Sequence, residues 1–305
     1  MSLDPSKHQR GRFGKFVPTI RSEAAPALPP AYSLDLIRSR GLLIDVLRAL
    51  APHREALTVV GAHAVFERTR ELEPVLISDT TRDADLGVTP GLLTATPLVS
   101  TVLGGLGLEE VRASLPGAWG LVSEHDRDLH DRLTIDLIAP ASLAGPGRRA
   151  AKVGEHGPRS VSKTAGTELT SVDRSLMQVS KLDGGDAVET YVAGHAALIC
   201  AKAYKLFDRL DDRELRRNRQ RLRTKDAGDV YRLMATSDPH EVRETFDAEE
   251  ADPSIGEAVR IGRERLLSIR EPMVDLARMH LQHVFPEDAV VEAMNDWLNN
   301  FDTGR

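Results

Sequence analysis

Cysteine, aromatic residues and long apolar runs are all scarce in this chain of 305 residues. Its single cysteine, Cys200, excludes an internal disulfide framework and a cysteine-rich zinc site. The aromatic content of 4% argues against a surface that stacks single-stranded bases. No run reaches the roughly 18 apolar residues that a membrane span needs, and the N-terminus lacks the apolar core of a signal peptide. We therefore expect a cytoplasmic protein that makes no contact with a membrane.

Charge is spread unevenly along the chain. The net charge is −6, and hydrophobic and charged residues make up 41% and 28% of the chain, as in an ordinary globular protein with one large domain or two small ones. Residues 213–225 hold seven basic residues against one acidic residue, and residues 1–22 carry a net charge of +4. Residues 236–305, in contrast, hold 16 acidic and seven basic residues. This asymmetry suggests that one face of the protein meets polyanions.

The chain divides into three segments in its sequence pattern. Residues 1–31 are polar, basic and rich in proline, which predicts a mobile arm. Residues 32–145 predict a small mixed β-sheet with helices: Ser33 is a predicted N-cap, and β-rich runs at 57–60, 82–88 and 133–138 predict strands. Residues 146–305 predict a basic loop, helices over 192–209 and 226–234, and two or three further helices after residue 254. The expected fold class is α+β, with a sheet-containing core and a helical second domain.

Three aspartates carry the clearest chemical signal. Residues i and i+2 of a strand point to the same face, so Asp83 and Asp85 are predicted to project side by side. Two such carboxylates repel each other unless a cation lies between them, and Mg²⁺ prefers oxygen ligands of this kind. Asp136 lies between Ile135 and Leu137 in another apolar strand, where a buried carboxylate needs a partner. Three carboxylates on two strands favour two-metal phosphoryl transfer.

The order of these motifs is more informative than any one of them. An Asp-x-Asp motif alone is common in surface turns, and a strand followed by glycine and a helix is common in many folds. Here Gly61 follows a buried strand and opens a helix, where backbone N–H groups can hold a phosphate. The Asp-x-Asp strand and the strand of Asp136 come after it. This order predicts a nucleotide site.

The same residues resemble the nucleotidyltransferase superfamily, which has the DNA polymerase β-like fold. The resemblance lies in Val60-Gly61-Ala62, in residues 81–85 and in residues 134–136, in that order. In the second half, residues 201–206 and 225–231 are similar to the AbiEii-like and MenT-like nucleotidyltransferase toxins of type IV toxin–antitoxin systems, in which one helix carries a lysine and a later helix begins with Lys-Asp. The resemblance covers about residues 55–235.

The resemblance implies a reaction and a set of roles. The chain would transfer a nucleoside monophosphate from an NTP to a hydroxyl acceptor and release pyrophosphate, with Mg²⁺ or Mn²⁺ as cofactor. The acceptor would be an RNA such as the 3′ end of a tRNA, a protein or a small molecule, and an antitoxin protein would be a partner. The implied metal ligands are Asp83, Asp85 and Asp136, the last as ligand or base. Lys202 would contact the triphosphate and Asp226 would support the site. The implied phosphate-binding residues are Gly61, Ala62, Thr81 and Arg82.

Two departures from the family pattern, the residue at position 62 and a longer gap between Gly61 and Asp83, accompany these predictions, together with several alternatives. Ala62 stands where the family usually has glycine or serine, and Thr80 or Thr81 is a substitute for the missing hydroxyl. Lys202 either extends to solvent or neutralises an anion, with Lys205 as the second candidate, and Asp229 is the alternative to Asp226.

Two other classes of function stay open beside the transferase. One is a non-catalytic nucleotide-binding or protein-interaction relative of the same fold, and the other is a metal-dependent nuclease or phosphotransferase that uses the same carboxylates. The basic run 213–225 is a solvated linker or an RNA contact, and a second basic stretch, 148–163, follows the strand of Asp136. Residues 124–131 look metal-like but lack a second cluster, and His63 is expected on a helix surface.

Overall fold

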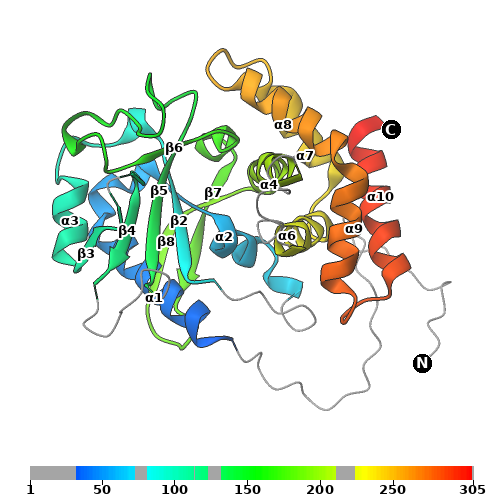
Figure 1. Ribbon diagram of the computed structural model, residues 1–305, viewed down its shortest axis with the longest axis horizontal. Helices are drawn as coiled ribbons and strands as arrows, with labels where there is room; N and C mark the ends of the chain where they lie inside the picture. Colours follow the sequence, from blue (N-terminus) through cyan, green and yellow to red (C-terminus); the bar gives the residue numbers. More distant parts are fainter. Residues whose placement is uncertain (1–31, 73–80, 113, 123–131, 211–223, 304–305) are drawn as a thin grey trace.

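A computed structural model describes residues 32–72, 81–112, 114–122, 132–210 and 224–303 (Figure 1). Over these residues the protein is a mixed α+β structure built around one eight-stranded sheet. The predicted arm 1–31 and the basic residues 211–223 lie outside the described residues, as do Thr80 and residues 124–131. None of the described helices is long and apolar enough to cross a membrane.

The sheet mixes parallel and antiparallel pairs. Its order is β3-β4-β5-β2-β1-β8-β7, and β6 pairs with β5. The pairs β1–β8, β2–β5 and β5–β6 are parallel, and the others are antiparallel. The strands are β1 (Leu57–Val60), β2 (Asp83–Val88), β3 (Leu108–Glu110), β4 (Ala118–Leu121), β5 (Thr134–Pro140), β6 (Ser162–Thr164), β7 (Arg174–Ser180) and β8 (Ala187–Ala193).

Helices cover both sides of the sheet. In Figure 1, α1 and α3 lie on one side, whereas α4 and α6 lie on the other, with the remaining C-terminal helices packed outside them. A continuous hydrophobic core runs from α1 through the strands to α10. The helices are α1 (Leu34–Ala49), α2 (Gly61–Arg68), α3 (Val99–Gly105), α4 (His195–Leu210), α6 (Thr224–Ala235), α7 (Pro239–Glu249), α8 (Gly256–Ser268), α9 (Arg270–Leu281) and α10 (Glu287–Thr303).

Local sequence rules explain the elements that frame the first half of the sheet. The hydroxyl of Ser33 accepts a hydrogen bond from the backbone N–H of Leu36 at 3.2 Å, which caps α1 as predicted. The predicted strands at 57–60, 82–88 and 133–138 correspond to β1, β2 and β5. Alternate residues are buried over 83–86 of β2 and over 134–139 of β5, so here each strand has one face in the core and one face that lines the cavity described below.

The second half differs from the prediction, because it contributes three strands to the same sheet. A boundary at residue 145 therefore cuts through the sheet, which continues through β6, β7 and β8. Val192, expected in a helix, belongs to β8, and α4 begins at His195. The missed strand β7 lies at an edge of the sheet and buries only Val179, while Leu176 is exposed. Its sequence therefore lacks the apolar alternation that identifies a strand.

Candidate active site

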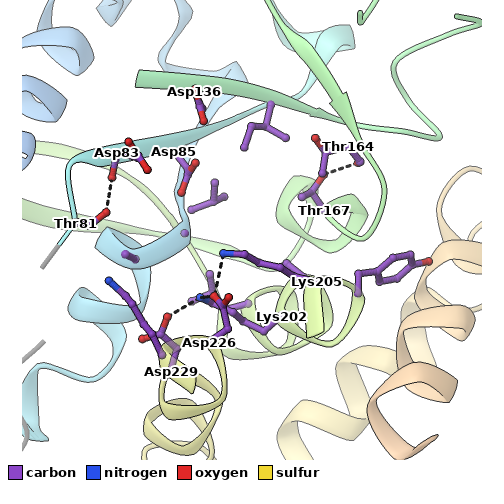
Figure 2. A pocket seen from close by; sticks show the side chains of 18 of the residues that line it. Thr81, Asp83, Asp85, Asp136, Thr164, Thr167, Lys202, Lys205, Asp226 and Asp229 are labelled. Carbon is purple, nitrogen blue, oxygen red and sulfur yellow. Dashed lines mark hydrogen bonds and ion pairs between the residues drawn. The ribbon is translucent and has the colours of Figure 1, made fainter. Parts of the chain in front are cut away.

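The three predicted aspartates meet on one face of the sheet. In the parallel pair of β2 and β5, Asp85 is the register partner of Asp136, and Asp83 is the partner of Thr134. Neighbouring strands lie about 4.8 Å apart, and register partners share a face. All four side chains line a cavity of about 980 Å³ between the sheet and helices α4 and α6 (Figure 2). The predicted juxtaposition of the three carboxylates is present in the structure.

Gly61 is the first residue of α2 and lies against the side chain of Asp85. Its φ of +62° lies in the region that only glycine adopts readily, and a Cβ at this position would coincide with Oδ2 of Asp85. Within the described residues, no side chain caps the N-terminus of α2. The first N–H groups of the helix are therefore available beside the carboxylates, and they can donate hydrogen bonds to an anion such as a phosphate.

The three carboxylates repel one another in a partly buried setting. Burial and the charges of Asp85 and Asp83 raise the pKa of Asp136 to about 7. Burial also raises the pKa of Asp85, and Asp83 adds to this shift, while Lys205 and Lys202 oppose it. Only Asp83 receives a hydrogen bond from a described residue, from the hydroxyl of Thr134 at 2.8 Å. A cation bound among these oxygens would remove the repulsion.

The donor set fits a divalent metal that is shared with a ligand. Among the described residues, no three or more His, Cys, Asp or Glu side chains form a group that could hold a metal ion by itself. Mg²⁺ seldom uses such closed protein cages, and typically takes one or two carboxylates together with phosphate oxygens of the substrate. Asp83, Asp85 and Asp136 supply carboxylates, and the N-terminus of α2 lies beside them.

Lys202 faces the same cavity but is already neutralised. Its Nζ lies 2.8 Å from Oδ1 of Asp226 and 2.5 Å from Oδ2 of Asp229, and all three side chains are buried. Although burial would lower the pKa of Lys202, the two carboxylates raise it well above its usual value. Lys202 thus holds α4 against α6.

Lys205, one turn further along α4, is the better placed cation. Its Nζ lies 2.9 Å from Oδ1 of Asp226, and its side chain is 46% exposed, against 8% for that of Lys202. Figure 2 shows Lys205 reaching between Asp226 and the sheet carboxylates, and it exerts the largest opposing charge on Asp85. Burial and the charge of Lys202 lower the pKa of Lys205. Lys205, which was the second candidate in the sequence analysis, is therefore the lysine that presents its charge to the cavity.

Asp226 organises these cations. It pairs with Lys202 and Lys205 through Oδ1 and with Arg209 through Oδ2. Burial would raise the pKa of Asp226, but Lys202 and Lys205 hold it well below its usual range. Asp226, at the start of α6, therefore stays ionised and fixes the lysines of α4. That Asp226 supports a catalytic site stays a prediction.

The other predicted phosphate-binding residues lie at the edge of the cavity. Ala62, Thr81 and Arg82 all line it. The hydroxyl of Thr81 donates to the backbone oxygen of Asp83 at 3.0 Å, and Nε of Arg82 lies 2.7 Å from a carboxylate oxygen of Asp35 in α1. Thr81 thus stabilises the start of β2, and the contact with α1 positions Arg82 beside the cavity.

A buried histidine supports the same strand start. His63 was expected on a helix surface, but it is buried, and its Nε2 lies 3.2 Å from the hydroxyl of Ser39 in α1. That hydroxyl donates to the backbone oxygen of Thr81 at 2.9 Å. Burial and the charge of Arg40 lower the pKa of His63 to about 3, so the ring is neutral and structural.

Sequence reasoning missed several lining residues. Thr134 lies two residues before Asp136 on the same strand face, a position that the alternation rule reaches. Asp229 lies one helical turn after Asp226 and was recognised only as its alternative. Arg132 and the threonines at and after the end of β6 gave no motif, because only the tertiary fold brings them to the cavity. These further lining residues are Arg132, Thr164, Thr167 and Thr170.

The second basic stretch is partly engaged within the protein. Arg159 forms an ion pair with Glu110, and Nζ of Lys163 donates to the backbone oxygen of Gly145 at 2.5 Å. Arg149 donates to the backbone oxygen of Ser114 at 3.3 Å. These contacts tie the loop to neighbouring segments, so they give these side chains a structural task.

Comparison with known proteins adds no relative. No family model, curated protein or solved structure matches the chain. The functional interpretation therefore depends on the geometry of the cavity.

Proposed function

We propose that the protein is a metal-dependent nucleotidyltransferase, which moves a nucleoside monophosphate from an NTP to an acceptor hydroxyl and releases pyrophosphate. One observation carries the proposal. Asp85 and Asp136 lie directly opposite each other on parallel strands, and Asp85 occupies the space that a side chain at position 61 would need. The carboxylates that we propose as metal ligands and the helix start that we propose as the phosphate site are thus in contact, and this reaction requires both groups close together.

Each group has a task in this proposal. Asp83, Asp85 and Asp136 would hold the divalent metal, which when bound neutralises phosphate charge and lowers the pKa of the attacking hydroxyl. The N–H groups at the start of α2 bind the anionic phosphates, and Gly61 permits their close approach. Lys205 adds positive charge on the opposite side of the cavity, where Asp226 fixes its position. The start of α2 and Lys205 together stabilise the negative charge that develops on the leaving pyrophosphate.

A transfer assay tests the proposal. The purified chain is incubated with each α-labelled NTP, Mg²⁺ or Mn²⁺ and total tRNA, and label is followed into RNA and into protein. We expect transfer that the double variant Asp83→Asn/Asp85→Asn reduces by at least about 10³-fold. Glu189→Gln, a half-exposed carboxylate on β8 that does not line the cavity, is the matched control and should keep full activity.

Other outcomes would point to other chemistry. Release of unlabelled ends from RNA, with no incorporation of label, would replace the transferase by a nuclease. No transfer, combined with no change in melting temperature on addition of NTP and metal, would overturn the proposal.

A further inference from the structure

The two ends of the cavity differ in charge. Near the carboxylates it is lined by ionised groups, whereas five lining residues of β5, α4 and the segment after β6 are uncharged: Ile138, Ala165, Thr167, Thr170 and Tyr204. Asp208, one turn after Tyr204, also lines the cavity, and its charge is paired with Arg265. Figure 2 shows Thr164 and Thr167 across the cavity from Asp83 and Asp85. A nucleotide has the same division, with anionic phosphates at one end and an uncharged base at the other.

The strands set the distance between these two ends. Gly87 and Ile138 are register partners that follow Asp85 and Asp136 on the same face, about 6.6 Å further along the strands. A Cβ on Gly87 would lie 3.3 Å from Oγ1 of Thr170, so this hydroxyl lies over the floor of the sheet. The threonine wall, by which we mean Thr167 and Thr170, is thus within reach of a nucleoside whose α-phosphate lies at the carboxylates.

The wall is rigid. It is formed by the 3-10 turn η6 (Glu168–Ser171) and the residues before it. The buried carboxylate of Glu168 accepts hydrogen bonds from the backbone N–H groups of Gly166, at 2.7 Å, and Ser142, at 3.3 Å. Gly166 has a φ of +87° and lies against the ring of Tyr204, where a Cβ would overlap the ring atoms. The threonine positions are thus fixed before any ligand binds.

The wall presents hydrogen-bond acceptors. A hydroxyl has one donor and two acceptor lone pairs. The hydroxyl of Thr167 donates to the backbone oxygen of Thr164 at 3.0 Å, and that of Thr170 donates to the backbone oxygen of Thr167 at 2.7 Å. Because both of these hydroxyl protons are used within the turn, Thr167 and Thr170 offer a ligand only acceptor lone pairs.

From this geometry we infer that the threonine wall is the nucleobase subsite, and that it selects a base with an exocyclic amino group, as in a 6-aminopurine or a 4-aminopyrimidine. The inference rests on the proposed function, since it assigns the base of the NTP in that reaction. An amino group donates to the hydroxyl oxygens of Thr167 and Thr170. A 6-oxo or 4-oxo base places an acceptor against these acceptors and leaves buried polar groups without partners, which disfavours it.

Binding measurements without an acceptor test the inference separately from catalysis. The full chain is titrated by calorimetry, in Mg²⁺, with the pairs CTP and UTP, and ATP and ITP, whose members differ by an amino and an oxo group at one ring position. We expect the amino member to bind at least about tenfold more tightly in at least one pair, with no oxo member preferred. This comparison uses the wild-type chain, so it does not depend on any variant.

Variants locate the preference. Thr167→Val and Thr170→Val should reduce it to less than about threefold, whereas Thr170→Ser, which keeps the hydroxyl, should retain it. Melting temperatures identify any variant that does not fold. Equal binding in both pairs, a preference for an oxo base, or a preference that survives in both folded valine variants would overturn the inference and leave nucleotidyl transfer in place. If no nucleotide binds and the transfer assay is also negative, the proposed function fails, and the inference fails with it.

Discussion

The cavity is lined by two clusters of aspartates, one paired with basic side chains and one not. On α6, Asp226 and Asp229 are matched by Lys202, Lys205 and Arg209, at distances that include 2.5 and 2.8 Å for Lys202. On β2 and β5, the three aspartates have no ion-pair partner among the described residues, and burial raises the pKa of two of them. A cluster of carboxylates that is paired with cations inside the protein has a structural role, whereas a cluster without cations is available to bind a ligand.

The largest effect that sharpens this comparison is expected at Gly61. Gly61→Ala places a methyl group where the carboxylate of Asp85 lies and imposes strain at a φ of +62°. We expect transfer activity to fall by at least about 10²-fold, because displacement of the carboxylate disrupts metal and phosphate binding together. Ala62→Gly, at the next residue, is the control and should cost less than tenfold. Near-normal activity of Gly61→Ala would contradict the proposed contact between helix start and metal site.

Removal of Lys202 should act on stability before it acts on chemistry. Lys202→Met leaves the buried carboxylate of Asp229 without this cation, and we expect a loss of about 3 kcal/mol in the free energy of unfolding, measured by urea denaturation. The double variant Lys202→Met/Asp229→Asn should recover part of this loss. A stable Lys202→Met variant with abolished nucleotide binding would instead show that Lys202 contacts the triphosphate directly.

Lys205 should give the opposite pattern. Its side chain is half-exposed, so Lys205→Gln should change stability by less than about 1 kcal/mol. Loss of a charge that faces the phosphates should raise KM for the NTP and lower kcat/KM by about 10- to 100-fold. Steady-state kinetics and a thermal melt of the same variant separate these two effects. Lys181→Gln, in the turn between β7 and β8, is the control, because Lys181 does not line the cavity. Unchanged kinetics would remove Lys205 from the site.

The smallest effect is expected from pH. In the folded, metal-free protein the pKa of Asp136 is raised to about 7, from 3.8. Ionisation is therefore easier in the unfolded chain, so this carboxylate lowers stability progressively as the pH rises from about 4 to about 7. In EDTA, Asp136→Asn should increase the melting temperature by at least about 3 °C at pH 8 and by little at pH 4.5. Mg²⁺ should raise the melting temperature of the wild type more than that of the variant at pH 8. If pH changes the melting temperatures of both proteins equally, the raised pKa of Asp136 is contradicted.

The sequence predicted the strand-borne part of the site well. Alternation placed Asp83 and Asp85 on one face, and the apolar neighbours of Asp136 identified β5, because strand periodicity is a local property. The choice between Lys202 and Lys205 depended on where α6 packs, which is a contact between residues 24 positions apart that no local pattern specifies. The threonine wall and the burial of His63 likewise arise from packing between distant segments.

The order of strands in the sheet has a mechanical consequence for the site. Val60 is the register partner of Asp85, so the residue before Gly61 and the carboxylate beside it belong to adjacent strands of one hydrogen-bonded ladder. The start of α2 and the carboxylates consequently move as one rigid body, whereas Lys205 belongs to α4 across the cavity. Any widening of the cavity would separate Lys205 from the carboxylates while leaving the geometry between the carboxylates and the helix start intact.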